Sequence, residues 1–468
     1  MGTLTSLMSL ASNALQAEQS ALNVTSNNVA NQNTVGYTRE VVNFQSQDTI
    51  TINGASYGDG VSIGTGATSV RDRILEQRVQ QQTQVEAQSS AVASALTAVQ
   101  SVFQLTATAS SAAATTLGSA IDSFYNSFTA LSANPSDPAT RQSVLSAASA
   151  LSNAFNAAST QLSSTSNSLN AEVTATVGQV NSLTTNIASL NQQISLLGSS
   201  SDAGVLEDQR QSSIAQLSGL IGLDQITTEQ NGITLTTSSG EVLVSGNQSY
   251  ALQTSQVAGQ TQVAAGPSAV DVTASITGGS LGGVLQARSQ LSTFSSSLDA
   301  LAYAVGTQVN TQNAAGLDGS GNAGGAIFTL SATSAGAAGS ISLATSNPNG
   351  IAAAAVGQGA TGNGNAVALA ALATGTSVSG QTPSASFASF LAQIGTAVSA
   401  ATSDNAVQQA SLTQLTSLRD SVSSVSLNQE ASNLTQYQRS YEAAAKVFSI
   451  VDELLADALN LGVSTAVS

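Results

Sequence analysis

The residue types that carry most enzyme chemistry are missing from this sequence of 468 residues, which contains no histidine and no cysteine. Histidine is the commonest general base and metal ligand near neutral pH, and thiol nucleophiles, thiolate metal sites and disulfides all require cysteine. A Ser–His–Asp or Cys–His arrangement is therefore impossible. We predict no catalytic residue, no cofactor and no metal site.

Carboxylates are the reactive groups that remain, and the chain has 26 Asp and Glu residues. Two carboxylates that face each other in a cleft can act as general acid and general base. The acids are scattered, and no spacing pairs two of them. A carboxylate-based hydrolase stays as an alternative that would need two acids from the middle of the chain, namely Asp224, Glu229, Glu241 or Asp271.

Charge excludes two classes of partner. The net charge is −16, and only ten residues are Lys or Arg. Nucleic acid binding needs a basic stripe that neutralises phosphates, and an anionic membrane surface would repel this chain. We therefore predict neither partner. The tight basic group Arg71, Arg73 and Arg78 contains Asp72 and Glu76, so we interpret it as a set of structural ion pairs.

The rest of the composition is neutral and polar. Charged residues make up 8% of the chain, well below the ~25% of an ordinary soluble protein. A neutral surface can pack against copies of itself with little desolvation of charge, which suits a polymer. Residues 1–38 contain no Lys or Arg, unlike the basic start of a secretory signal. The chain is thus expected to be cytoplasmic or exported without a cleaved signal.

Long helices are predicted at both ends of the chain, over residues 4–31 and 428–461. Each carries apolar residues at seven-residue spacing, which is typical of coiled coils, and a stripe on both segments favours pairing of the two ends. The predicted packing residues are Met8, Leu15, Leu22 and Val29 in the first helix and Leu427, Leu434, Tyr437, Tyr441, Phe448, Val451 and Leu455 in the second.

Between the ends, helical patterns cover residues 70–131, 139–197, 206–221, 283–312 and 387–424. Short β-type runs lie between residues 223 and 281, among them Tyr250–Leu252 and Ile276, with hairpin signals such as Asn231-Gly232. The predicted fold class is mainly α with inserted β: a long antiparallel helical bundle, coiled-coil terminal helices and a small β domain.

The expected domains follow from these patterns. Residues 1–45 and 426–468 form a terminal coiled-coil assembly domain, and residues 222–282 form the small β domain. Residues 46–221 and 283–425 form a helical core domain. The Gly/Ala-rich insertion at 316–363 is either loosely structured or built from further short strands at Phe328–Leu330 and Ile341–Leu343.

The turn that follows the first helix, Asn27-Asn-Val-Ala-Asn-Gln-Asn-Thr-Val-Gly-Tyr-Thr-Arg39, resembles the N-terminal signature of the flagellar rod, hook and hook-associated protein family. Its Gly36-Tyr37-Thr38-Arg39 end is similar to the branch of that family that joins hook to filament. Further similar segments follow in the family's order, and they include Leu131–Arg141, Asp208–Arg210, Gly282–Arg288 and Asn428–Tyr441.

The resemblance implies a structural subunit without enzyme activity, located outside the cell in the flagellum. Its terminal helices would pair as an inner layer, and its copies would form a junction ring between hook and filament. The implied partners are other copies of the chain, the hook protein and hook-associated protein 3. The resemblance also implies type III export, with a flagellar export chaperone on the C-terminal segment.

Within the turn, Gly36 is expected to adopt a positive φ, and the side chains of Asn31 and Asn33 are expected to cap it. Tyr37 and Arg39 are expected to anchor the turn to a neighbouring domain. The alternative is that these residues only stabilise the turn itself. The predicted assembly motif comprises Asn28, Asn31, Asn33, Thr34, Gly36, Tyr37 and Arg39.

Two other functions remain open. One is a different axial role, of the hook or distal rod type, which the order of addition at the growing tip would distinguish. The other is a secreted adhesin or glycan-binding protein, suggested by the Ser/Thr-rich β region. An adhesin of this kind predicts a concave aromatic site, whereas aromatic residues make up 4% of the chain and tryptophan is absent.

Overall fold

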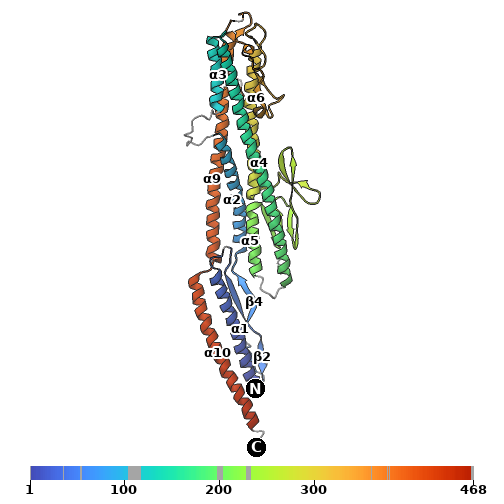
Figure 1. The fold of residues 1–468 in the computed structure, drawn as a ribbon. Coiled ribbons are helices and arrows are strands. Elements are labelled where there is room, and N and C mark those ends of the chain that lie inside the picture. Colours follow the sequence, from blue (N-terminus) through green and yellow to red (C-terminus); the bar gives the residue numbers. More distant parts are fainter. Residues whose placement is uncertain are drawn as a thin grey trace.

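The protein is an elongated rod whose helices run along its length (Figure 1). This computed structural model describes residues 2–464 except residues 35, 53–54, 59, 104–116, 198–203, 228–232, 360, 377 and 379. Helices dominate, and small antiparallel sheets are inserted between them. The predicted fold class, mainly α with inserted β, is confirmed.

One end of the rod holds both termini. Helices α1 (Gly2–Asn31) and α10 (Leu427–Ser464) lie side by side and antiparallel (Figure 1). Strands β1 (Glu40–Ser46) and β4 (Val61–Ser69) pair and pack on α1. The hairpin of β2 (Thr49–Ile52) and β3 (Ala55–Gly58) connects them. We call α1, β1–β4 and α10 the terminal unit, so residues 46–69 lie with the terminal helices rather than with the core.

Six helices form the core: α2 (Arg73–Val102), α3 (Leu117–Ala133), α4 (Pro138–Leu197), α5 (Gly204–Leu220), α6 (Gly279–Ala314) and α9 (Pro383–Ser423). Helix α2 packs on both α9 and α6, and α4 packs on α3, α5 and α6. The helical pattern predicted over 70–131 is two helices, because α2 ends at Val102 and α3 begins at Leu117.

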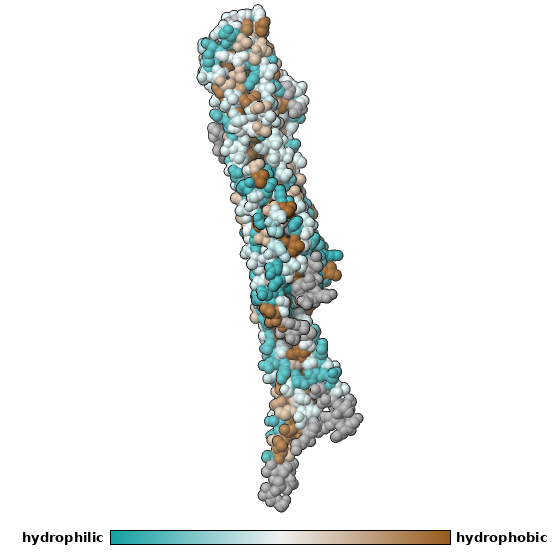
Figure 2. Space-filling view, turned by 90° about the vertical axis from the view of Figure 1, so that its right-hand side faces the viewer, coloured by the Kyte–Doolittle hydropathy of each residue, from teal (hydrophilic) through white to brown (hydrophobic). Residues whose placement is uncertain are grey.

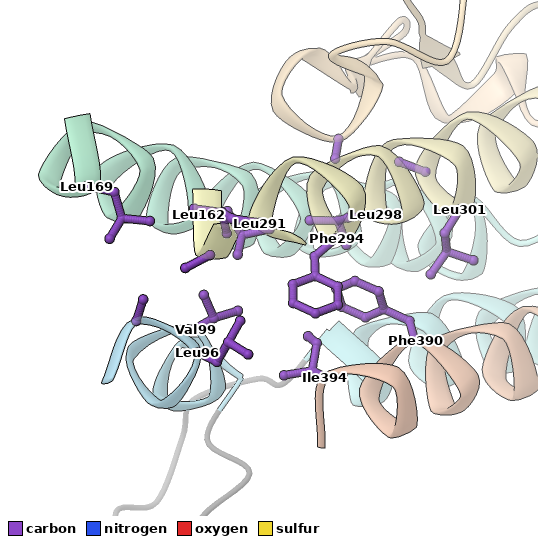
Figure 3. Packing of buried hydrophobic residues seen from close by; sticks show 14 of the residues in the cluster. Leu96, Val99, Leu162, Leu169, Leu291, Phe294, Leu298, Leu301, Phe390 and Ile394 are labelled. Atoms are coloured by element: carbon purple, nitrogen blue, oxygen red, sulfur yellow. The ribbon is translucent and has the colours of Figure 1, made fainter. Parts of the chain in front are cut away.

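A continuous hydrophobic cluster runs through the core and into the end of the rod opposite the two termini. Two of its aromatic members, Phe124 and Phe128, meet edge-on with their ring centroids 5.1 Å apart. Among the described residues, none from the terminal unit belongs to this cluster. Side chains from four helices that meet in it are shown in Figure 3: Leu96, Val99, Leu162, Leu169, Leu291, Phe294, Leu298, Leu301, Phe390 and Ile394.

The β unit projects from the side of α4 (Figure 1). Strands β5 (Leu223–Thr227), β6 (Ile233–Thr237), β7 (Val242–Ser245) and β8 (Gln248–Ser249) form one antiparallel sheet in chain order. Strands β9 (Gln253–Val257), β10 (Gln260–Ala265) and β11 (Val270–Asp271) form the other sheet. The predicted hairpin signal Asn231-Gly232 lies outside the described residues.

The predicted strand Tyr250–Leu252 is wrong, because this segment connects the two sheets. The side chain of Asn181 on α4 donates to the Leu252 carbonyl oxygen and accepts from its N–H, each at 2.8 Å. The side-chain amide thus takes the backbone groups that a strand would give to its neighbour. The predicted strand residue Ile276 is also outside any strand and is buried.

Asparagines along α4 fasten the β unit. Asn170, Asn181 and Asn191 follow one another at about three helical turns, so they lie on one face. Asn170 Nδ2 donates to the Gly259 carbonyl oxygen at 3.0 Å, and Asn191 Nδ2 donates to the Gly246 carbonyl oxygen at 2.8 Å. The sheets are therefore held to the helix by hydrogen bonds from asparagine side chains to the backbone of the β unit, as well as by apolar packing.

Three buried arginines each end a segment that resembles the flagellar family, and two of them reinforce these contacts. Arg288 donates to Asn170 Oδ1 at 3.1 Å, and Arg210 donates to Asn191 Oδ1 at 2.9 Å. Arg141 donates through Nε to the Pro135 carbonyl oxygen at 2.9 Å. Burial lowers the pKa of all three guanidinium groups. The sequence patterns assigned them no role.

The Gly/Ala-rich insertion contains the short strands that the sequence left open. β13 (Phe328–Thr329) pairs with β14 (Ser342–Leu343), and β12 (Gly316–Leu317) pairs with β15 (Ala354–Ala355). Helices α7 (Ala337–Ser340) and α8 (Gly364–Ala371) and the 3₁₀ turn Pro348–Gly350 complete this end. Completely buried apolar side chains anchor it, among them Ile327, Ile341 and Ile351.

Candidate functional site

The turn between α1 and β1 contains the predicted assembly motif. Gly36 has a φ of +83°, as predicted, and a side chain there would be strained. The Thr34 N–H donates to the Asn31 carbonyl oxygen at 2.9 Å, and the Tyr37 N–H donates to the Thr34 carbonyl oxygen at 3.1 Å. These bonds turn the chain back along α1.

Asn28 is the centre of the hydrogen bonding and is buried. Its Oδ1 accepts from the Tyr37 hydroxyl at 2.8 Å and from the Glu40 N–H at 2.9 Å. Its Nδ2 donates to the Glu40 carbonyl oxygen at 2.8 Å and to Glu430 Oε2 at 3.2 Å. One side chain therefore joins α1, the turn, β1 and α10.

The other asparagines of the motif do not join separate elements as Asn28 does. Asn31 Nδ2 donates to Asn27 Oδ1 at 2.7 Å, and Asn31 Oδ1 accepts from the Thr34 hydroxyl at 3.2 Å. Asn31 thus bridges the turn as predicted. Asn33 is exposed.

Arg39 links the turn to α10, near the other end of the chain. Its Nε lies 2.8 Å from Glu430 Oε1, and the Glu430 side chain is only 1% exposed. The Arg39 N–H donates to the Ser423 carbonyl oxygen at 3.0 Å. The Arg39 side chain therefore contacts α10 within the terminal unit rather than a neighbouring domain, and its backbone contacts the end of α9. Tyr37 bonds back to α1. Sequence reasoning missed Glu430, although it is the sole acid in the segment Asn428–Tyr441.

The basic group at the start of α2 contributes a structural ion pair, as predicted, but its partner is not one of the neighbouring acids. Arg71 is paired with Asp208 of α5, and its guanidinium also donates to Thr38 Oγ1 at 3.0 Å. The Asp72 side chain is occupied as the N-cap of α2, where it accepts the backbone N–H groups of residues 74 and 75. Glu76 lies 3.9 Å from Arg419.

The most buried face of α1 differs from the predicted stripe. The buried positions carry small or polar residues, namely Ala11, Ala17, Ala21, Thr25 and Asn28. The predicted residues Met8, Leu15 and Leu22 are half-buried, and Val29 is 37% exposed. They lie about a quarter turn away around the helix. Small residues let α1 fit between α10 and the strands, which the spacing of large residues alone did not reveal.

The predicted stripe on α10 does face inward, except at its first residue. Val451 is buried, Leu427 is 49% exposed, and the others are half-buried: Leu434, Tyr437, Tyr441, Phe448 and Leu455. The Tyr437 ring lies 6.2 Å from the Phe44 ring of β1. Burial raises the pKa of Tyr437 and of Glu18 on α1.

A second apolar stripe on α10 faces outward. Ala443, Val447, Ile450 and Leu454 follow at steps of four, three and four, so they share one flank of the helix. Val447, Ile450 and Leu454 are 46%, 57% and 50% exposed. We call these four residues the outward stripe. Figure 2 shows hydrophobic residues on this narrow end of the rod.

Of the acids that the sequence left as catalytic candidates, the described ones are distributed over the β unit. The described residues include no group of three or more Asp or Glu residues placed to hold a metal ion. A groove of about 640 Å³ between α2, α6 and α9 is lined by amide and apolar side chains and one carboxylate, Asp404. Of the candidate acids, Asp224 and Asp271 lie in different sheets, and Glu229 is outside the described residues. Over the same part of the chain, no helix has the length and apolar content of a membrane span.

Three family models match successive parts of the chain. Residues 8–38 match the flagella basal body rod protein model, and residues 419–461 match the C-terminal model of the flagellar basal body rod FlgEFG proteins. Residues 102–328 match the helical domain of the flagellar hook-associated protein FlgK. Flagellar hook-associated protein 1 of Bacillus subtilis is 28% identical over 497 residues, with 96% of each chain covered.

The chain is thus similar to flagellar hook-associated protein 1 over almost its whole length. The Escherichia coli member is 27% identical over 342 residues, and the match spans 70% of this chain and about 60% of the length of that relative. The structure of the flagellar hook junction protein FlgK from Burkholderia pseudomallei shares the fold, with a TM-score of 0.66 and 20% identity. It covers 74% of this chain, and all of that structure is matched.

Proposed function

We propose that this protein is a structural subunit of the bacterial flagellum, and that its copies form the junction ring connecting the hook to the filament. One observation carries the proposal. The segments that match rod proteins are α1 and α10, which pair with each other, and the segment between them matches the hook-associated helical domain. An axial assembly element and a junction-type body are thus joined in one chain.

The terminal unit is the assembly domain in this proposal, and the core and the β unit extend from it. The inward stripe of α10 is used within the chain, so neighbouring subunits need another surface. The outward stripe supplies one, because its apolar residues gain burial only from a neighbour. The motif residues around Gly36 hold α10 in the orientation that presents this stripe.

The proposed partners are other copies in the ring, the hook protein on one side and hook-associated protein 3 on the other. An export chaperone would cover the C-terminal segment before assembly, since the outward stripe would otherwise be exposed in the cytoplasm. The subunit would then work outside the cell after export. We propose no enzyme activity, which accords with the lack of histidine and cysteine.

Deletion of the gene, followed by electron microscopy of the cell surface, tests this function. The expected result is complete hooks without filaments, with filament protein shed into the medium. Re-expression of the wild-type chain restores filaments. Intact filaments on the deletion strain would refute the proposal.

A second axial role, of the hook or distal rod type, is favoured by the rod-protein matches at both ends. That role predicts a different defect, because loss of a hook or rod subunit stops growth before a hook is complete. The length of the hooks in the deletion strain separates the two: full-length hooks support the junction role, and absent or truncated hooks support the alternative.

A further inference from the structure

The terminal unit and the core meet at a joint where α9 and β4 end, on the side of the rod's middle nearer the termini (Figure 1). The chain crosses this joint twice, between β4 and α2 at residues 70–72 and between α9 and α10 at residues 424–426. Neither crossing is helical, so both can absorb a change in backbone angles. Two non-helical crossings side by side are typical of a hinge.

Near the joint, Leu75 and Val79 in the first turns of α2 are buried but lie outside the continuous core cluster. The continuous core cluster reaches down α2 only to Val92 and down α9 only to Val398, several helical turns from the crossings. Across the joint, β4 lies against α5. Units joined without a large apolar interface are expected to move relative to one another.

Polar bonds span the joint. Thr38 of the terminal unit donates its backbone N–H to the Asp208 carboxylate of the core. Arg71, on the crossing between β4 and α2, donates to both Thr38 Oγ1 and Asp208. Thr38 is 3% exposed, and the side chains of Arg71 and Asp208 are each 15% exposed. The three residues close a ring of bonds between the two units, largely shielded from water.

The arginine contact is built for release rather than for maximum strength. Arg71 meets Asp208 through one nitrogen, and its Nε is buried without a hydrogen-bond partner among the described residues. A bidentate pair would satisfy two nitrogens and hold more tightly. On the terminal side, Arg39 and Asn28 hold Glu430 independently, so the pairing of α1 with α10 does not depend on Arg71.

We propose that the joint is a hinge between the terminal unit and the core, and that Thr38, Arg71 and Asp208 form a latch that holds it in one position. Opening the latch lets the two units reorient as rigid bodies. The hinge is a property of the single chain and does not depend on the flagellar role. In a junction it would let one subunit fit two tubular neighbours of different geometry.

The test measures distances across the joint in the purified full-length protein. Because the chain has no cysteine, Gln414→Cys on α9 and Gln438→Cys on α10 introduce two spin labels at exposed sites. Helix rise places them roughly 35 Å apart, within reach of pulsed dipolar spectroscopy. Arg71→Gln and the near-isosteric Asp208→Asn each remove one side of the latch. Arg78→Gln is the matched control, since it removes an exposed arginine seven residues further along the chain, on α2.

The unaltered latch should give one narrow distance distribution. Both latch variants should broaden it about two-fold or more, and the double variant should broaden it no further, because either change opens the same contact. The control should match the unaltered protein. The inference is overturned if the distribution is already as broad with the latch intact, or if Asp208→Asn leaves it narrow. Circular dichroism confirms that each variant keeps its helices.

Discussion

At the scale of single residues, a buried carboxylate organises the site. Glu430 is shielded from water, and Arg39 and Asn28 both bond to its carboxylate. A buried charge without such partners is strongly destabilising. The contact therefore makes the orientation of α10 depend on the turn that follows α1.

Arg39→Gln should loosen the terminal unit by about 2 kcal/mol, less than for a fully buried pair because Arg39 is 27% exposed. Hydrogen exchange of α1 and α10 amides measures the loss. Glu430→Gln should also loosen the unit, and the double variant should lose less than the sum of the two. Arg439→Gln, on the exposed side of α10, is the control and should change nothing. Additive losses would show that Arg39 and Glu430 do not act as a pair.

Arg288→Met should release the β unit from α4 at a cost of about 3 kcal/mol, because Asn170 Oδ1 and the Thr261 carbonyl oxygen lose a charged donor. Limited proteolysis of the β unit and urea unfolding measure the effect. Arg73→Met removes an exposed arginine and should leave both unchanged. Equal behaviour of the two variants would show that Arg288 does not hold the β unit to α4.

Residue types predicted part of this site. Gly36 was predictable because its backbone angle suits glycine alone, and Asn31 because asparagine commonly bridges turns. Glu430 was not predictable, because its partner Arg39 lies 391 positions away and no local pattern links them. The partner of Arg71 was not predictable for a related reason. The nearby acids are engaged elsewhere, because Asp72 caps α2 and Glu76 lies beside Arg419.

At the scale of elements, periodicity located the helices but not every buried face. Large apolar residues at seven-residue spacing identified both terminal helices. On α10 these residues face inward, whereas on α1 the inward face is made of alanines whose spacing carries no contrast in hydrophobicity. Tyr250–Leu252 has a strand-like composition but bonds to a helix side chain, a tertiary contact that local sequence does not encode.

The two stripes of α10 should respond differently to a buried charge. Phe448→Asp places a carboxylate against α1 and should destabilise the terminal unit by about 3 kcal/mol. Ile450→Asp should change its stability by less than about 0.5 kcal/mol, because the residue is 57% exposed, yet it should abolish filament attachment in the deletion strain.

Ser449→Asp is the matched control for Ile450→Asp, because it adds the same charge at an exposed position outside the outward stripe. It should support filaments. Hydrogen exchange of the terminal helices and microscopy of the cells provide the two measurements. Normal filaments with Ile450→Asp would show that the outward stripe is not an assembly surface.

At the scale of the whole molecule, buried acids and excess negative charge both make the folded state more stable as the pH falls. Burial raises the pKa of Glu18, of Glu76 against the opposing effect of Arg419, and of Asp208 against that of Arg71. The folded chain therefore takes up these protons at a higher pH than the unfolded chain. Protonation also reduces the self-repulsion of a chain with net charge −16.

Stability should consequently increase as the pH falls from about 7 to about 5, through the raised folded-state pKa values, before the ordinary acid range is reached. The midpoint of thermal unfolding should rise by a few degrees. The exposed Asp271, whose pKa is lowered by hydrogen bonds from Thr273, acts with the opposite sign only at lower pH. Asp208→Asn should flatten the rise, and a midpoint that falls over this range would contradict the assignment.

Isolated hooks from the deletion strain test most directly whether this chain joins hook to filament. Purified protein is added to them, bound subunits are located by immunogold electron microscopy, and the hooks are then supplied with hook-associated protein 3 and filament protein. The account predicts that the protein binds at one end of each hook and that only these hooks grow filaments. Hooks that grow filaments without the protein, or that fail to bind it at either end, would contradict the account.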